Sequence, residues 1–179
     1  ALSVYLKLQN PKHVILKNDS DLETPGQIEV PEFTVTAASS SEIDVNLTTT
    51  KSQINLRENA KGQLNIRTEQ LEVKMSDRTD LKGKFTAQSA QVNMGGSAEF
   101  NPRGKTASLN LALTGKADYK GDDFDSKNAS ATLSDRSNAA VSAEESLSVF
   151  AQDKAVINVY GKPDISVKAL NDDAQINKK

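Results

Sequence analysis

The sequence predicts an all-β fold, a β-helix (solenoid) whose coils recur about every 19 residues. Three observations lead to this expectation: apolar residues recur at a nearly constant separation, they alternate with polar residues around each recurrence, and small polar residues follow. An antiparallel β-sandwich is the alternative, because regular short strands also suit that fold. A sandwich, however, gives no reason for a constant period with the same turn chemistry.

Nine apolar positions define the repeat, with successive separations of 19, 19, 19, 19, 19, 20, 18 and 18 residues. They are Leu16, Val35, Ile54, Val73, Val92, Leu111, Ala131, Val149 and Val167. In a strand, the residues two before and two after each of them share its face. Of these 27 positions 25 are apolar, with Asn18 and Ser52 the exceptions, whereas a 36% apolar composition would place about 10 there. The residues between them are polar except Ile15, Ala112 and Phe150, so a repeated half-buried strand is expected.

Short polar segments follow these strands, as at residues 38–41, 76–79, 95–97 and 134–137, and their composition suits turns. A second, weaker strand follows each turn, and its glycines suggest tight corners. Its apolar residues are Ile43, Val45, Leu47, Leu64, Ile66, Leu81, Phe85, Ile157 and Val159. Nineteen residues therefore predict a coil of two or three short strands, with equivalent residues stacked about 4.8 Å apart. The five prolines, at positions 11, 25, 31, 102 and 163, fall outside the main apolar positions.

The length of 179 residues predicts one domain over 1–179, with residues 1–25 forming an N-terminal capping strand and first coil and residues 26–179 the remaining coils. The capping strand is expected at residues 4–8, where apolar and polar residues alternate. The 22 basic and 24 acidic residues give a net charge of −2, which argues against nucleic-acid binding. The absence of Cys excludes disulfides and thiolate metal sites. No apolar run approaches the roughly 20 residues of a membrane helix, and we expect any export signal to have been removed.

The recurring strand and turn resemble a known family. The segment from Val92 to Ala98, in which Gly95 and Gly96 follow an alternating strand, and the closing segment from Val159 to Val167 are similar to the putative auto-transporter adhesin, head GIN domain family of Bacteroidetes-type envelope proteins. The similarity spans roughly residues 26–179, although the turns at residues 76–79 and 134–137 depart from the family's small-residue turn. The resemblance implies a single-stranded right-handed parallel β-helix, export to the periplasm, outer membrane or cell surface, and an adhesin-like role. It implies no catalytic residue.

Candidate chemistry is sparse. His13 is the one histidine and has no second His or Cys to form a metal site or a triad with it. The acidic cluster of Asp122, Asp123 and Asp125 could offer oxygen ligands to a hard cation, but it lacks the order of an EF-hand, and we expect a solvated turn that absorbs the 20-residue interval.

Sugar chemistry is the other possibility for this fold. Asp44, Glu72 and Asp118 are candidate carboxylates for glycoside hydrolysis, which needs two carboxyls at a defined separation. Aromatic platforms for sugar rings are few. Phe33, Phe85, Phe100 and Tyr119 are expected in the core, and Phe150 and Tyr160 are expected to face outward.

The sequence thus predicts no catalytic, cofactor-binding or metal site, and a non-enzymatic envelope protein that presents its strands to a protein or glycan ligand. A carbohydrate-active β-helix enzyme and a binder of small lipids or glycans are the alternatives, and a homo-oligomer is left open.

Overall fold

The chain folds into a β-solenoid. The computed structural model describes Lys7 and residues 9–179. Within them the strands are β1 (His13–Leu16), β2 (Asp21–Glu29), β3 (Glu32–Ala37), β4 (Glu42–Thr48), β5 (Lys51–Leu56), β6 (Lys61–Met75), β7 (Asp80–Met94), β8 (Glu99–Leu113), β9 (Asp118–Leu133), β10 (Asn138–Ala151), β11 (Val156–Gly161), β12 (Asp164–Leu170) and β13 (Gln175–Lys178). Except for Lys7, the predicted capping strand at residues 4–8 lies outside the described residues. The described part of the chain has no helix with the length and apolarity to cross a membrane.

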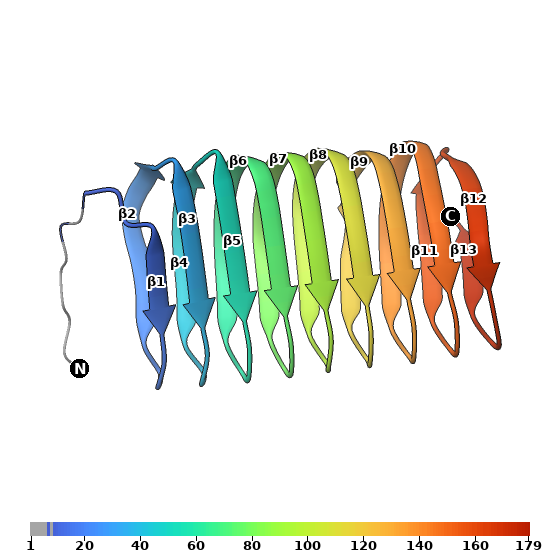
Figure 1. The fold of residues 1–179 in the computed structure, drawn as a ribbon, viewed down its shortest axis with the longest axis horizontal. Helices are drawn as coiled ribbons and strands as arrows, with labels where there is room; N and C mark the ends of the chain where they lie inside the picture. The colour runs from blue at the N-terminus through green and yellow to red at the C-terminus, as the bar shows by residue number, and fades with distance from the viewer. Residues whose placement is uncertain (1–6, 8) are drawn as a thin grey trace.

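Every described strand pair is parallel, which confirms the β-helix and excludes the antiparallel sandwich. Figure 1 shows two facing layers of strands joined by tight turns along one edge and by corners along the other. The front strands descend, the rear strands ascend, and successive coils advance from the N-terminal to the C-terminal end, so the winding is right-handed. The front layer contains β1, β3, β5, the C-terminal halves of β6–β10 and β12; the rear layer contains the N-terminal halves and β2, β4, β11 and β13.

The predicted register is confirmed from the third strand onward. Val35, Ile54, Val73, Val92, Leu111, Ala131, Val149 and Val167 stand opposite one another in successive coils. The predicted second strand is confirmed too, because all the apolar residues assigned to it are buried.

The first coil departs from the prediction. Val14, not Leu16, lies opposite Val35, so this coil is 21 residues long. The two additional residues lie in β2, where the register shifts between Glu23 and Gln27. Pro25 and Gly26 lie in this bulge, within β2. A constant period cannot anticipate a bulge, and the predicted alignment of the first coil was therefore wrong by two residues.

Strand β12, the last of the strands that the sequence predicted, also departs from the prediction. Val167 was expected in the core but is 50% exposed. Among the described residues β12 is the outermost strand of the front layer and pairs only with β10, so the stack packs against Val167 from one side only. A register shift between Val149 and Phe150 further disturbs the alternation along β12.

Aromatic rings stack in the core of the middle coils. Phe85 packs edge-on against Phe100 at 5.4 Å between ring centroids, and Phe100 packs against Tyr119 at 5.9 Å. Gly121 leaves space for the last of these rings, since a Cβ on it would lie 2.2 Å from the Tyr119 ring. Gly83 allows a close approach of two strands, since a Cβ on it would lie 1.8 Å from the Leu64 carbonyl oxygen. The sequence suggested tight corners for such glycines, whereas both lie within strands.

The Tyr119 side chain is fully buried, and its hydroxyl has no hydrogen-bond partner among the described residues. Burial raises the pKa of this phenol. Tyr119 therefore serves as a core aromatic residue, as the sequence predicted.

The acidic insertion is a strand bulge and not the predicted turn. Residues 121–125 lie within β9, where Phe100 pairs with Tyr119 but Gly104 pairs with Phe124, so β9 has one residue more than β8. The inserted segment is anchored by Phe124, which is buried, while Asp122, Asp123 and Asp125 are exposed. The expectation of solvated carboxylates holds, but their location at a turn was wrong because the apolar Phe124 holds the segment against the core.

Candidate interaction face

The two layers of the solenoid present different chemistry to solvent. On the rear layer the outward positions are rich in charge, as in the row of Glu42, Lys61, Asp80, Glu99 and Asp118 that the strand register aligns. On the front layer the equivalent rows contain mainly hydroxyl and amide side chains. This contrast identifies the front layer as a distinct surface.

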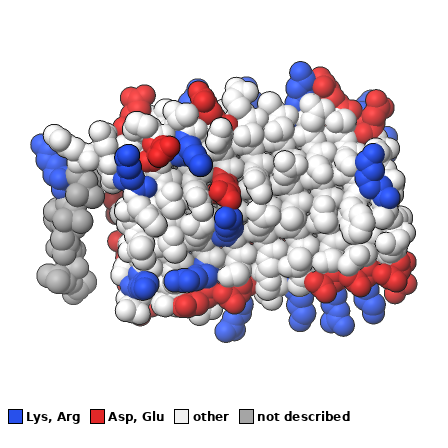
Figure 2. Space-filling model, in the orientation of Figure 1, with Lys and Arg blue, Asp and Glu red and all other residues white. Residues whose placement is uncertain are grey.

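We call this surface the hydroxyl–amide face. It consists of two outward rows on β3, β5 and the C-terminal halves of β6–β10: Thr34, Gln53, Glu72, Gln91, Asn110, Ser130 and Ser148 in one row, and Thr36, Asn55, Lys74, Asn93, Ala112, Thr132 and Phe150 in the other. Within these two rows the only charged residues are Glu72 and Lys74. Figure 2 shows a broad uncharged area toward the C-terminal side of this layer, with charged groups along the upper and lower edges.

The face is built by the strand period. Val73 and its counterparts point into the core, so the residues on either side of each point outward. Parallel strands about 4.8 Å apart then repeat each outward position in a straight row. The result is a flat array in which hydrogen-bonding groups recur at a fixed spacing.

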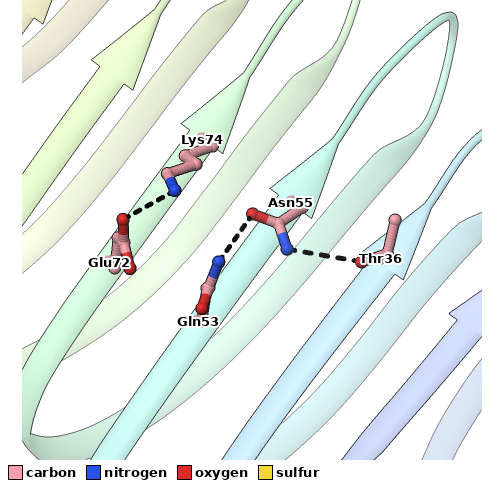
Figure 3. Close-up of polar contacts among 5 residues, drawn as sticks. All are labelled: Thr36, Gln53, Asn55, Glu72 and Lys74. Atoms are coloured by element: carbon pink, nitrogen blue, oxygen red, sulfur yellow. Dashed lines mark hydrogen bonds and ion pairs between the residues drawn. The ribbon is translucent and has the colours of Figure 1, made fainter.

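Side chains on the face restrain one another, as Figure 3 shows. The Asn55 amide donates to the Thr36 hydroxyl at 3.3 Å and accepts from the Gln53 amide at 3.3 Å. Lys74 Nζ lies 2.9 Å from Glu72 Oε1, so the two charges neutralise each other on the same strand. A ligand on this face therefore meets ordered polar groups and no net charge.

A shallow groove of about 640 Å³ crosses the lower part of the face beside the turns. Its walls include Asn55, Lys74, Asn93 and Ala112 from one outward row, and Arg57 and Thr114 from the turns. The groove gives the flat array one concave strip along the solenoid axis.

Apolar side chains flank the polar rows at both ends. Phe150 is 38% exposed in the last coil of the face, and Ile15 is 58% exposed on β1 next to Thr36. The prediction that Phe150 points outward is confirmed. Tyr160, also predicted to face outward, is half-buried on β11, and the four aromatic residues expected in the core are buried there.

The three candidate carboxylates do not meet. Glu72 lies on the front layer, whereas Asp44 and Asp118 lie on the rear layer. Asp44 and Asp118 are separated by about four coils, which is roughly 19 Å along the axis at 4.8 Å per coil. That separation exceeds the roughly 5–9.5 Å between the carboxyl groups of glycosidases, so these residues form no such pair.

Asp118 instead meets Glu99, a neighbour that the sequence did not single out. The two stand opposite each other in β8 and β9, and Lys120 Nζ lies 2.6 Å from Glu99 Oε1 and 3.8 Å from Asp118 Oδ2. Burial raises the pKa of the Asp118 carboxyl, Lys120 acts against this shift, and the Glu99 charge adds to it. The 19-residue separation of Glu99 and Asp118 was the signal that could have revealed this pair.

The remaining candidates are His13 and the acidic residues of the β9 bulge. His13 is exposed on β1, opposite Thr34 at the edge of the front layer. Asp125 accepts a hydrogen bond from Ser142 Oγ at 2.8 Å, while Asp123 lines a groove on the rear layer. Among the described residues no three His, Cys, Asp or Glu side chains converge as a metal site would require.

Comparison with known proteins gives a family but no characterised relative. The model of the family described as putative auto-transporter adhesin, head GIN domain, matches residues 52–163, which is more than half of the chain although less than the range from 26 to 179 that the motifs suggested. No curated protein and no solved structure matches the chain. The family's description suggests a surface or envelope protein. This chain, a right-handed β-solenoid with a hydroxyl–amide face, belongs to the putative auto-transporter adhesin, head GIN domain family.

Proposed function

We propose that this protein is a non-enzymatic, exported envelope protein that binds a neutral glycan through its hydroxyl–amide face. The observation that supports the proposal most is the composition of that face, where hydroxyl and amide groups recur along the axis and the one pair of charges is internally neutralised. The adhesin description of the family agrees with a binding role.

The chemistry of the face suits sugar hydroxyls. Amide groups offer both donors and acceptors, and serine and threonine hydroxyls can do either, so the array matches a ligand whose surface is mostly hydroxyl. The straight rows suit an extended polymer better than a compact molecule, because the same groups recur coil after coil. Phe150, exposed at one end, offers an apolar surface on which a sugar ring could stack.

The test is electrophoresis of the purified protein through gels that each contain one soluble polysaccharide: dextran, mannan, xylan or a β-glucan. We expect at least one of these to retard the protein. The double variant Asn93→Glu, Asn110→Glu places two carboxylates on the face and should abolish the retardation.

The matched control is Asn138→Glu, Asn158→Glu, which makes the same change on the rear layer. This control should migrate with the same retardation as the unmodified protein. Passage of the unmodified protein through all four gels without retardation, or an equal loss in both variants, would reject the glycan ligand on this face. A protein ligand would then be the better interpretation.

A second function is favoured by one observation, the proximity of Glu99 and Asp118. A carboxyl group with a raised pKa beside a second carboxylate is the arrangement that glycoside hydrolysis uses. The same polysaccharides, incubated with the protein and assayed for new reducing ends, test it directly. Turnover that Asp118→Asn abolishes would replace the binding proposal with an enzymatic one.

A further inference from the structure

The rear layer contains a second concave surface, which the hydroxyl–amide face does not include. A groove of about 620 Å³ lies over β4, β6, β7 and β8, and Asp123 in the β9 bulge forms one of its walls. Gly83 helps to shape the floor: its φ of 150° and its contact with the Leu64 carbonyl leave no room for a side chain there. We call this surface the basic groove.

Three cations line the basic groove. Lys82 and Lys84 alternate with Gly83 on β7, so both point to the same side, and Arg103 stands directly opposite Lys84 on β8. None of the three forms an ion pair among the described residues, in contrast to neighbouring Lys120, which is held by Glu99 and Asp118. Asp44 and Asp123 also line the groove, which leaves one net positive charge.

The pairing of Lys84 with Arg103 is unfavourable for the fold. Like charges directly opposite each other on neighbouring strands destabilise a sheet. Both side chains are exposed, so neither is needed to cover the core. The stability of the fold therefore does not explain why Lys84 and Arg103 face each other. The binding of an anion by both side chains would explain it.

The side chains that line the basic groove indicate which class of anion it binds. Arginine offers a fork of donors that fits a carboxylate, and Lys82 and Lys84 add positive charge from the same side of β7. Gln63, Asn65 and Asn101 add amide groups, and Asp44 and Asp123 can accept hydrogen bonds from hydroxyls. The two carboxylates also disfavour a densely charged polymer such as a nucleic acid. We propose that the basic groove binds a carboxylate-bearing oligosaccharide, with its carboxylate on Lys84 and Arg103.

The experiment is isothermal titration of the whole chain with trigalacturonic acid and with its methyl ester, which has the same sugars without the charge. We expect the acid to bind and the ester to bind at least about tenfold more weakly, because a charge-assisted hydrogen bond is lost. Lys84→Ala, Arg103→Ala should weaken binding of the acid by at least about tenfold as well.

The control variant is Lys116→Ala, Arg136→Ala, which removes one lysine and one arginine from exposed turns. It should keep the affinity of the unmodified protein. Equal affinities for acid and ester, an equal loss in the control, or no binding of the acid would overturn the proposal.

Two further measurements distinguish anion binding by Lys84 and Arg103 from a structural role and from binding at the opposite layer. The thermal midpoint of Lys84→Ala, Arg103→Ala should be unchanged or higher, because a repulsive pair is removed; a large fall would show that the pair supports the fold instead. Asn93→Glu, Asn110→Glu should still bind the acid, since the hydroxyl–amide face lies on the other layer. If the experiments reject ligand binding at the basic groove, the proposal for the hydroxyl–amide face can still be tested, and the reverse also holds.

Discussion

Single residues at the turns link one coil to the next. Each of several turns has a residue with positive φ, among them Glu58, Asp77, Gly96, Gly115 and Asp135. Four aspartates with positive φ accept a backbone hydrogen bond from the preceding turn. The Glu58 N–H donates to the Asp77 carboxylate at 2.9 Å, and the Gly115 N–H donates to the Asp135 carboxylate at 2.9 Å. The N–H groups of Asp135 and Asp153 donate in the same way to Asp153 and Asp172. Aspartate suits this position because its short side chain tolerates the left-handed conformation and can reach nearby backbone.

Asp77 should make the stability of the protein depend on pH below about 4. The Glu58 N–H, and then the Ser76 hydroxyl, hold the pKa of the Asp77 carboxyl below its ordinary value of 3.8. A lowered pKa in the folded state contributes stability above the unfolded pKa, and that contribution is lost as the pH falls through the folded value. We therefore expect thermal midpoints of Asp77→Asn to fall less between pH 5 and pH 2 than those of the unmodified protein. Parallel curves for the two proteins would contradict this role.

The alternation along a strand should separate buried from exposed positions sharply. Val92 is 1% exposed, whereas Asn93 next to it faces outward. Val92→Asp buries a charge among apolar side chains and should cost at least several kcal/mol in the free energy of unfolding. Asn93→Asp should change it by less than about 1 kcal/mol. Urea unfolding of both variants checks this, and similar losses would disprove the register.

At the scale of elements, the strands were more predictable than their irregularities. Val92 and its counterparts could be identified because a two-residue alternation within a 19-residue period is recorded directly in the sequence. The bulges in β2 and β9 could not, since a bulge changes the pairing partner without changing the alternation on either side. The basic groove could not be predicted from the sequence for the same reason, because it depends on the conformation of Gly83 and on the bulge in β9.

The β9 bulge should depend on Phe124 and not on its acidic residues. Phe124 is 2% exposed, and its removal would leave a cavity beneath the inserted segment. Phe124→Ala should therefore destabilise the protein by about 3–5 kcal/mol. Asp122→Ala, on the exposed part of the same bulge, should have an effect within about 0.5 kcal/mol. Chemical denaturation distinguishes the two, and the reverse ranking would show that the acidic residues hold the segment.

Calcium should leave the bulge unaffected. A site present only in the folded state would stabilise it by about 2.7 kcal/mol at a hundredfold excess of calcium over the dissociation constant. Because Asp122, Asp123 and Asp125 are exposed and form no convergent ligand set among the described residues, we expect equal thermal midpoints in millimolar calcium and in chelator. A rise of several degrees in calcium that Asp123→Asn removes would reveal a ligand set here.

At the scale of the whole molecule, charge is divided between the two layers. The front layer presents two polar rows whose only charges are the paired Glu72 and Lys74, and the rear layer presents alternating charge with the basic groove. These polar rows were visible in the sequence as the polar residues between the repeated apolar positions. Their assembly into one face became clear only when the strand register aligned them and placed the charged candidates Asp44 and Asp118 on the opposite layer. A solenoid with two chemically different sides can hold two ligands without either blocking the other.

The most direct test of the central claim, that the hydroxyl–amide face is the binding surface, is an NMR titration that follows side-chain amide resonances. The face contains Gln53, Asn55, Gln91, Asn93 and Asn110, and the rear layer contains Gln63, Asn65, Asn101 and Asn138. With the neutral polysaccharide that retards the protein most, we predict shifts in the first group and none in the second. Shifts confined to the rear-layer amides would contradict the claim.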